Sequence, residues 1–258
     1  MAARTLVFAP HPDDEVLGCG GTIARKALAG TDVRVVIMTD GRTSHAHLID
    51  PEQLVLIRRA EAGAAARELG LDPTTCTFLD FPDGELHRHR TPAIAAVSDL
   101  LGSFQPDEVY VPHRDDRQPD HVATYHIVQS ALRRHAPAVR MFEYPVWLWH
   151  AWPWTRGAGP AGGMARSSHL LGTISAMWEL AFRCRERSDV SDVLDRKLRA
   201  LGAYHSQMER RGGDPRWPVL ADVADGEFLR HFTGPEEYFR SSRGGLGRSA
   251  TEGTGADR

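Results

Sequence analysis

The amino-acid sequence predicts an α/β protein in which helices cover both faces of a mostly parallel central sheet. Over residues 1–145, short runs of apolar and β-branched residues alternate with longer helical patterns. Strands that alternate with helices indicate βαβ units, and in such units helices cover both faces of a parallel sheet. The content of 41% hydrophobic and 25% charged residues in a chain of 258 residues is that of a globular protein with a full core.

The elements of this region have recognisable sequence signals. The run of residues 33–39 (Val-Arg-Val-Val-Ile-Met-Thr) is rich in β-branched residues and ends at the turn signal Asp40-Gly41. The helical pattern of residues 51–69 ends where Gly70 occupies the C-terminal stop position. In order, we expect strands over residues 6–10, 33–39, 76–79, 108–111 and 139–144, and helices over residues 16–29, 51–69, 91–103 and 121–134. This order predicts a Rossmann-like arrangement.

The sequence pattern changes after Tyr144. Five of the six tryptophans fall between Trp147 and Trp178. Farther on, we expect a helix near residues 170–182, a short segment over residues 183–188 and a helix over residues 190–209. Residues 1–240 are interpreted as one domain with a C-terminal elaboration, and residues 241–258 as a disordered tail, because the tail lacks apolar residues to bury.

Residues 146–182 form the aromatic-rich part of this elaboration. Aromatic side chains stack on sugar rings and acyl chains, which favours an insertion or lid that selects the substrate. Aromatic side chains fill cores and dimer interfaces equally well, so a plain core and a homo-oligomer interface are the alternatives.

Charge and composition exclude several classes of protein. A formal net charge of −3 does not indicate non-specific nucleic-acid binding. No long uncharged apolar run indicates a membrane span, and the N-terminus leads directly into the first expected strand without a signal-peptide pattern, so we expect a cytoplasmic protein. The three cysteines, Cys19, Cys76 and Cys184, are too few and too scattered for a disulfide framework.

Titratable side chains gather directly after the first expected strand. The segment Thr5–Gly21 passes from an apolar run into His11, Asp13, Asp14 and Glu15. Open α/β sheets place their active sites at the carboxyl ends of such strands. Adjacent unpaired carboxylates would be costly to bury, and a cation would remove that cost. Histidine and aspartate are ligands that suit zinc, whereas a solvated turn with a chance histidine is the alternative.

A second polar cluster follows the expected strand of residues 108–111 and ends at His121. Because the carboxyl ends of parallel strands meet at one rim, His121 is expected to reach His11 and Asp14. Two histidines, one aspartate and a water form the open four-coordinate arrangement of catalytic zinc, and the same set can hold Fe(II). Asp13 cannot easily share the direction of its neighbour, so it suits either general-base work or the orientation of a ligand. By itself, His121 would more simply be a solvent-facing residue at a helix start.

These segments resemble the LmbE-like, or PIG-L, zinc-dependent N-deacetylases. The family's first motif stands here as Ala9-Pro10-His11-Pro12-Asp13-Asp14-Glu15. Further matching segments follow in the family's order, at Thr39-Asp40-Gly41, Arg58…Glu61, Phe81-Pro82-Asp83-Gly84, Pro119-Asp120-His121, Glu143-Tyr144-Pro145-Val146-Trp147 and Lys197…Ser206-Gln207. The resemblance extends over residues 4–210 and is weakest over residues 148–182.

The resemblance implies a role for each matched side chain. The implied metal ligands are His11, Asp14 and His121. Asp13 matches the catalytic base of the family, and Arg58 and Asp83 match positions that hold sugar hydroxyls in family members. A surface helix charge and a turn carboxylate are the alternative explanations for Arg58 and Asp83.

The sequence departs from the family's second motif at Gln118, where the family usually has histidine. A glutamine at this position can donate a hydrogen bond to a developing oxyanion, but it cannot transfer a proton at neutral pH. The proton for the leaving amine would then come from Asp13, or from a nearby histidine such as His113.

We therefore expect a zinc-dependent N-deacetylase that removes an acyl group, most simply acetyl, from an amino-sugar-containing small molecule. Secondary-metabolite and low-molecular-weight thiol biosynthesis are the two expected settings. The alternatives are an amidase of thiol conjugates within the same family and a metal-binding module without activity. Retention of Asp13 argues against the inactive module, because a protein that only binds metal does not need a base.

Overall fold

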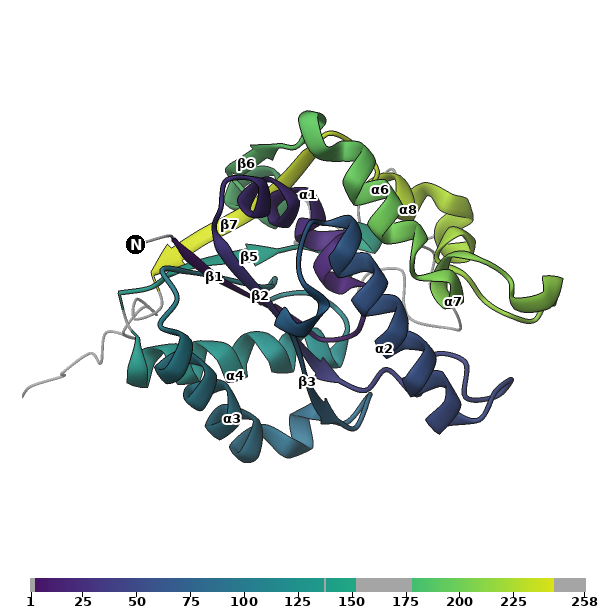
Figure 1. The fold of residues 1–258 in the computed structure, drawn as a ribbon, viewed down its shortest axis with the longest axis horizontal. Coiled ribbons are helices and arrows are strands. Elements are labelled where there is room, and N and C mark those ends of the chain that lie inside the picture. Colours follow the sequence, from purple (N-terminus) through teal and green to yellow (C-terminus); the bar gives the residue numbers. More distant parts are fainter. Residues whose placement is uncertain (1–2, 137, 152–177, 244–258) are drawn as a thin grey trace, which may run out of the picture.

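The computed structural model describes residues 3–136, 138–151 and 178–243, and its centre is a seven-stranded sheet of order β3-β2-β1-β4-β5-β7-β6 (Figure 1). The strands are β1 (Arg4–Ala9), β2 (Asp32–Thr39), β3 (Cys76–Phe81), β4 (Glu108–Pro112), β5 (Arg140–Tyr144), β6 (Glu186–Asp189) and β7 (Glu236–Arg243). The α-helices are α1 (Asp14–Leu28), α2 (Pro51–Glu68), α3 (Arg90–Phe104), α4 (Pro119–His135), α6 (Leu194–Gly202), α7 (His205–Met208) and α8 (Glu227–Arg230).

The first five strands pair in parallel, as the alternation of strand and helix patterns predicts. β7 is antiparallel to β5, and β6 is antiparallel to β7, so the C-terminal part of the chain extends the sheet at one edge. The predicted fold class, a mostly parallel sheet with a C-terminal elaboration, is confirmed. The sequence analysis missed β7, because its residues (Glu-Glu-Tyr-Phe-Arg-Ser-Ser-Arg) are mostly charged or polar and do not form an apolar run.

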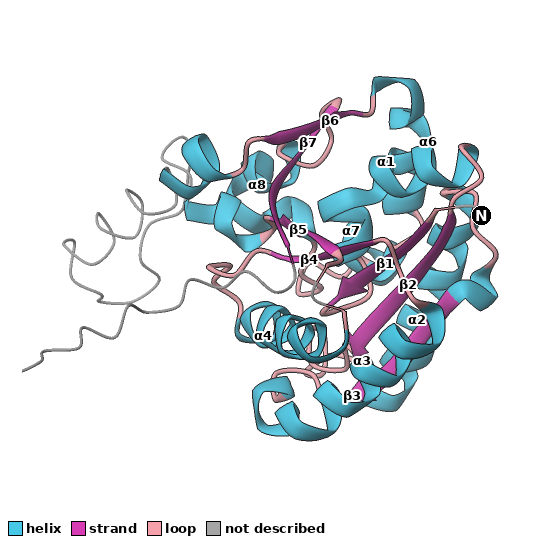
Figure 2. Cartoon of the chain, turned by 90° about the vertical axis from the view of Figure 1, so that its left-hand side faces the viewer, coloured by secondary structure: helices cyan, strands magenta, loops and turns pink. Residues whose placement is uncertain are grey.

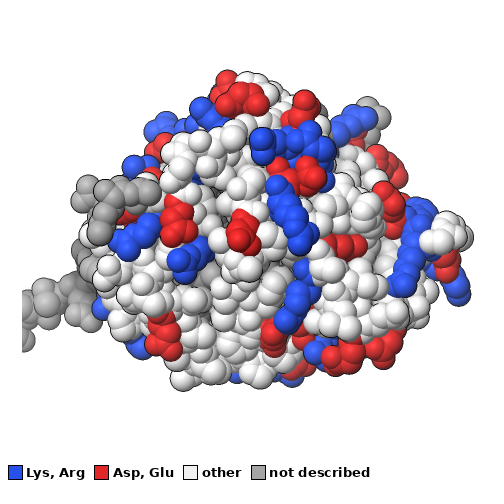
Figure 3. Space-filling model, in the orientation of Figure 1, with Lys and Arg blue, Asp and Glu red and all other residues white. Residues whose placement is uncertain are grey.

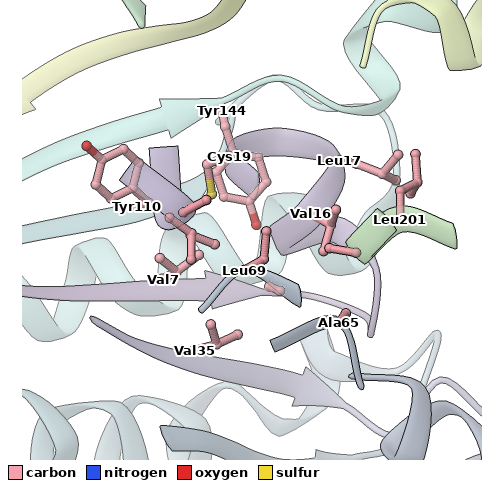
Figure 4. Packing of buried hydrophobic residues seen from close by; sticks show 14 of the residues in the cluster. Val7, Val16, Leu17, Cys19, Val35, Ala65, Leu69, Tyr110, Tyr144 and Leu201 are labelled. Carbon is pink, nitrogen blue, oxygen red and sulfur yellow. The ribbon is translucent and has the colours of Figure 1, made fainter. Parts of the chain in front are cut away.

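Helices cover both faces of the sheet (Figure 2). One buried cluster joins the sheet to α1, α2, α6 and α8, and a second joins it to α3 and α4. Figure 4 shows part of the first cluster, in which Val7 of β1 and Val35 of β2 lie on the same face of the sheet as Cys19 of α1. Gly18 lets α1 approach β5, because a Cβ atom there would stand 2.1 Å from the Tyr144 ring. Close packing on both faces holds the carboxyl ends of β1 and β4 in place.

Helix α1 is interrupted at Cys19, where φ is −151° and ψ is 25°. The interruption frees the backbone N–H groups of Gly21 and Thr22, and both donate to the carboxylate of Glu237, at 2.7 and 2.8 Å. Lys197 of α6 donates to the same carboxylate at 2.8 Å. Glu237 thus accepts the backbone hydrogen bonds that an N-cap residue would accept in an ordinary helix.

The helix expected over residues 190–209 is not continuous, so that prediction is wrong in detail. It divides into α6 and α7, with Tyr204 between them at φ −82° and ψ 60°. The ring of Tyr204 at this interruption is fully buried.

Several expectations fall on residues beyond the described ranges. Most of the proposed aromatic lid (152–177) and most of the expected tail (244–258) lie there, as does most of the helix expected near residues 170–182. Residues 179–183 form one short π-helical turn, and residues 241–243 belong to strand β7 rather than to a tail. The division into one domain and a tail stays a prediction.

Two further features concern the helices and the surface charge of the described residues. No helix in the described ranges has both the length and the apolar character needed to cross a bilayer. On the face in Figure 3, lysine and arginine side chains are interspersed with aspartate and glutamate, and they do not form a basic stripe.

Candidate metal centre

The three predicted ligands converge where β1 and β4 end. His11 and Asp14 follow β1, and His121 lies in the first turn of α4, which follows β4. Asp14 Oδ2 lies 3.1 Å from His11 Nδ1 and 3.1 Å from His121 Nε2. One nitrogen or oxygen atom from each residue lies within 4.8 Å of the others, which is close enough for one cation. The three side chains lie close together because β1 pairs in parallel with β4, so that the carboxyl ends of both strands lie at the same edge of the sheet.

His121 Nε2 is the buried atom that most clearly fits a cation. Its residue is fully buried, and among the described residues this nitrogen has no hydrogen-bond partner, although Asp14 Oδ2 is near. A buried nitrogen that lacks a well-aligned hydrogen bond is costly, and a metal ion would use its lone pair. Two imidazole nitrogens and one carboxylate suit Zn²⁺ and also Fe²⁺.

The other ring nitrogen of each histidine faces carboxylates. His121 Nδ1 lies 2.9 Å from Asp116 Oδ2, whereas His11 Nε2 lies 3.1 Å from Asp83 Oδ1 and 3.4 Å from Asp120 Oδ2. Metal-binding histidines commonly donate their second N–H to a carboxylate, which fixes the ring and its tautomer. The sequence analysis did not assign Asp116 or Asp120, because the polar cluster holds three aspartates and only the folded turn shows which of them faces a ring.

Charge around these ligands favours a cation. Burial raises the pKa of Asp14, but the adjacent His121 and His11 hold it well below its usual range. Burial lowers the pKa of His121, yet Asp14 and Asp116 outweigh burial and raise it to about 9. The carboxylates therefore stabilise positive charge at this point of the molecule.

Asp13 lies beside the ligands in an unusual backbone conformation, with φ at 126°. A non-glycine residue at positive φ is strained, and such residues cluster at functional sites. Its Oδ2 lies 3.2 Å from Arg58 Nη2. Burial raises the pKa of Asp13 to about 8, against the opposing effect of Arg58. Asp13 is thus a buried carboxyl group poised near neutral pH.

A cavity of about 210 Å³ adjoins the predicted ligands. Its lining includes most of the predicted site residues and, beyond them, three polar and three apolar side chains, which are Thr43, Ser44, Gln207, Leu17, Trp147 and Leu220. His121 is behind this surface, since it is fully buried. A larger cavity of about 740 Å³ lies beside Trp149 and Tyr238 and has none of the predicted site residues in its lining.

Arg58 and Asp83 both line the cavity, and both are also engaged by the protein. The Arg58 guanidinium donates to the carbonyl oxygens of Pro12 and Gly41. Asp83 Oδ2 accepts from both the N–H and the hydroxyl of Thr43, at 2.9 and 2.7 Å. These contacts fix the two side chains before any substrate arrives. Whether they hold substrate hydroxyls stays a prediction.

Gln118 has two separate contacts. Its side-chain oxygen accepts from the backbone N–H groups of Asp120 and His121, so it is the N-cap of α4. Its amide nitrogen lies 3.5 Å from His11 Nε2, at the cavity lining. The capping interaction orients the amide N–H₂ group toward the cavity, where it can serve as a hydrogen-bond donor.

His113, the alternative proton donor, lies elsewhere. It is fully buried, its Nε2 lies 3.6 Å from Glu179 Oε2, and it is not among the described residues that line the cavity. Its position therefore gives no support to a role in proton delivery.

Known proteins resemble this chain in sequence and in fold. The family model of PIG-L, described as GlcNAc-PI de-N-acetylase, matches residues 6–132. The protein named "Uncharacterized deacetylase YaiS" from Escherichia coli (strain K12) is 33% identical over 149 residues, which is 55% of this chain and 75% of the relative. The 1D-myo-inositol 2-acetamido-2-deoxy-alpha-D-glucopyranoside deacetylase of Mycobacterium sp. (strain KMS) is 30% identical over 239 residues, which is 81% of this chain and 75% of the relative.

A solved structure agrees with the fold. The N,N'-diacetylchitobiose deacetylase from Pyrococcus horikoshii superposes with a TM-score of 0.64 at 22% identity, covering 94% of this chain and 85% of that one. At this identity the likeness establishes the architecture, and the chemistry has to be argued from the residues of the site.

Proposed function

The chain belongs to the PIG-L, or LmbE-like, family of deacetylases, and we propose that it is a metal-dependent hydrolase of an N-acyl amino sugar. The group removed is acetyl in the simplest case. The observation that carries the proposal is the convergence of His11, Asp14 and His121 beside a cavity, with Asp13 next to them.

His11 Nδ1, Asp14 Oδ2 and His121 Nε2 are the atoms that would hold the ion, Zn²⁺ or Fe²⁺. When bound, such an ion supplies polarisation of the amide carbonyl and acidification of a water. Asp116 holds the ring of His121, and Asp83 holds that of His11, so both rings are oriented in advance.

Asp13 acts as the general base. Its carboxylate takes a proton from the attacking water and passes that proton to the leaving nitrogen, so one group serves both steps. Its elevated pKa of about 8 suits a group that is protonated and deprotonated in one catalytic cycle, and an adjacent cation would bring that pKa down toward neutrality. This arrangement requires no histidine at position 118.

The cavity lining suggests how a sugar would be held. Gln118 offers an amide N–H to the oxyanion that forms from the carbonyl. Arg58 and Asp83 line the cavity and would contact the ring hydroxyls, and Trp147 and Leu220 offer an apolar wall. At about 210 Å³, the cavity is smaller than the roughly 300–1,000 Å³ of drug-sized ligand sites, which favours a single sugar ring within it.

The names of the relatives narrow the choice of substrates. The Mycobacterium relative is named for a 2-acetamido-2-deoxy-glucopyranoside, and the Pyrococcus structure for diacetylchitobiose. We extend this class to the present chain, in a secondary-metabolite or low-molecular-weight thiol pathway. An amide of a thiol conjugate is the second candidate class.

The test is release of acetate from a panel of N-acetylated glucosaminides, with a thiol-conjugate amide as a comparison. A chelator should abolish release, and added Zn²⁺ or Fe²⁺ should restore it. Asp13→Asn should bind the ion as the unmodified protein does and lose about 10²–10⁴-fold in kcat, the usual contribution of a general base. Activity that survives complete removal of metal would refute the proposal.

A further inference from the structure

Glu15 accepts hydrogen bonds at both of its carboxylate oxygens. Tyr204 O–H donates to Oε1, and the backbone N–H of Asp13 donates to Oε2 at 3.1 Å. All three residues are buried, and the Tyr204 ring is fully so. Both neighbours are donors, and the carboxylate offers a separate acceptor oxygen to each of them.

Asp13, whose backbone N–H donates to Glu15, has a strained backbone conformation. Asp13 holds a φ of 126°, which persists only where the surroundings over-determine it. Its carbonyl oxygen accepts from the N–H groups of Val16 and Leu17 at the start of α1. Arg58 contacts its side chain, and the remaining polar group, its backbone N–H, is held by Glu15. Loss of that last contact would free the peptide to relax toward an unstrained conformation.

We propose that Tyr204 is a positioning residue for Asp13, and that it acts by fixing the carboxylate of Glu15. This inference rests on the proposed function, in which Asp13 is the base. Tyr204 lies at the interruption between α6 and α7. A residue from the C-terminal part of the chain thus helps to orient the carboxylate of Asp13, which lies close to the N-terminus.

The side chain and the backbone of Asp13 are held by different partners, which makes the inference testable. Arg58 contacts the carboxylate from α2, whereas the described hydrogen bonds of Glu15 and Tyr204 reach the backbone N–H of Asp13 and not its carboxylate. Removal of the Tyr204 hydroxyl should therefore misplace the base without removing it. A displacement of about 1 Å at a reacting group can cost roughly 100-fold in rate.

The first experiment compares Tyr204→Phe with Tyr144→Phe. Tyr144 is the matched control, because it is also fully buried and its hydroxyl donates to a backbone carbonyl, that of Phe8, at 2.7 Å. Tyr204→Phe should lower kcat by about 10- to 100-fold with KM and metal stoichiometry unchanged. Tyr144→Phe should leave kcat within a few-fold. Equal kcat in the two variants would overturn the inference.

The second experiment is a double-mutant cycle with Asp13→Asn. If Tyr204 acts through Asp13, Tyr204→Phe should lower kcat in the unmodified protein and have no further effect once the Asp13 carboxylate is gone. An undiminished effect in the Asp13→Asn background would refute the positioning role. If Asp13→Asn alone keeps full activity, the proposed function fails instead, and the two failures are thus distinguished.

Glu15→Gln provides a second variant if Tyr204→Phe does not fold. Glutamine keeps the size of the side chain but has one acceptor oxygen for two donors. The same loss in kcat at unchanged KM is expected, and full activity of Glu15→Gln would contradict the inference.

Discussion

Lys197 Nζ lies 2.8 Å from Glu237 Oε1, and each of these side chains is 1% exposed. The pair joins α6 to β7 where α1 is interrupted, and the same carboxylate accepts from two backbone N–H groups of α1. The lysine charge offsets the cost of burying the glutamate, and the glutamate in turn holds the second half of the helix.

The buried pair leads to a prediction about stability. Lys197→Met leaves Glu237 charged and without its ion pair, so it should lower the free energy of unfolding by about 3–5 kcal/mol. Lys26→Met is the matched control, because Lys26 pairs with Glu108 at a partly exposed position, where a pair contributes only about 0–1 kcal/mol. Urea denaturation of both variants measures the difference. Equal losses would show that the buried pair has no special role.

A second prediction concerns metal affinity. Asp116→Asn weakens the contact that fixes the ring of His121, so it should raise the dissociation constant for Zn²⁺ by about 10- to 100-fold. Competition with a chromophoric chelator measures this without any substrate. Asp115→Asn changes an exposed neighbour and should leave affinity unchanged. If Asp116→Asn binds as tightly as the unmodified protein, the ring is held by other contacts.

Substitutions at Gln118 should separate its two contacts. Gln118→Ala removes both the cap of α4 and the amide donor, so it should cost about 1 kcal/mol of stability and about 10- to 100-fold in kcat. Gln118→Ser keeps a capping oxygen and should recover the stability but not kcat. Gln118→His should be tolerated, because the family usually has histidine there. Full kcat in Gln118→Ala would rule out its role as an oxyanion donor.

The raised pKa of His113 should be visible in the pH dependence of the free energy of unfolding. Burial lowers its pKa, but Cys184 and Glu179 outweigh this and raise it from 6.5 to about 10. A raised folded-state pKa means stabilisation that is complete below pH 6.5 and is lost as the pH rises through about 10. His113→Gln should therefore destabilise most at pH 6 and least at pH 10, as measured by urea denaturation. A difference that is constant with pH would contradict the raised pKa.

The convergence of the proposed metal ligands could be predicted from the sequence, because residues that follow neighbouring parallel strands lie at the same edge of the sheet. Polar residues that follow buried parallel strands meet at one rim, and His11 and His121 obey this rule. The partners that hold them could not be predicted in the same way. Tyr204 reaches Glu15 only because a helix that looks continuous in the sequence is interrupted, and helical periodicity does not reveal that interruption.

Strand β7, which lies between β5 and β6 in the sheet, was missed for a related reason. Glu237 appears in the sequence as a surface carboxylate, and its burial depends on Lys197 and on N–H groups that become free only where α1 bends. Such contacts are decided by tertiary structure, so neither residue pattern nor propensity reveals them.

The hydrogen bond between Gly21 and Glu237 spans 216 positions of sequence, which has a consequence for synthesis on the ribosome. The N-terminal strands and helices emerge first and can begin to fold while translation continues. The second half of α1, however, lacks its acceptor until Glu237 has left the exit tunnel. We therefore expect the nascent chain to carry Asp14 at the start of an unfinished helix, with His11 just before it, and tight binding of the proposed ion to follow completion of translation.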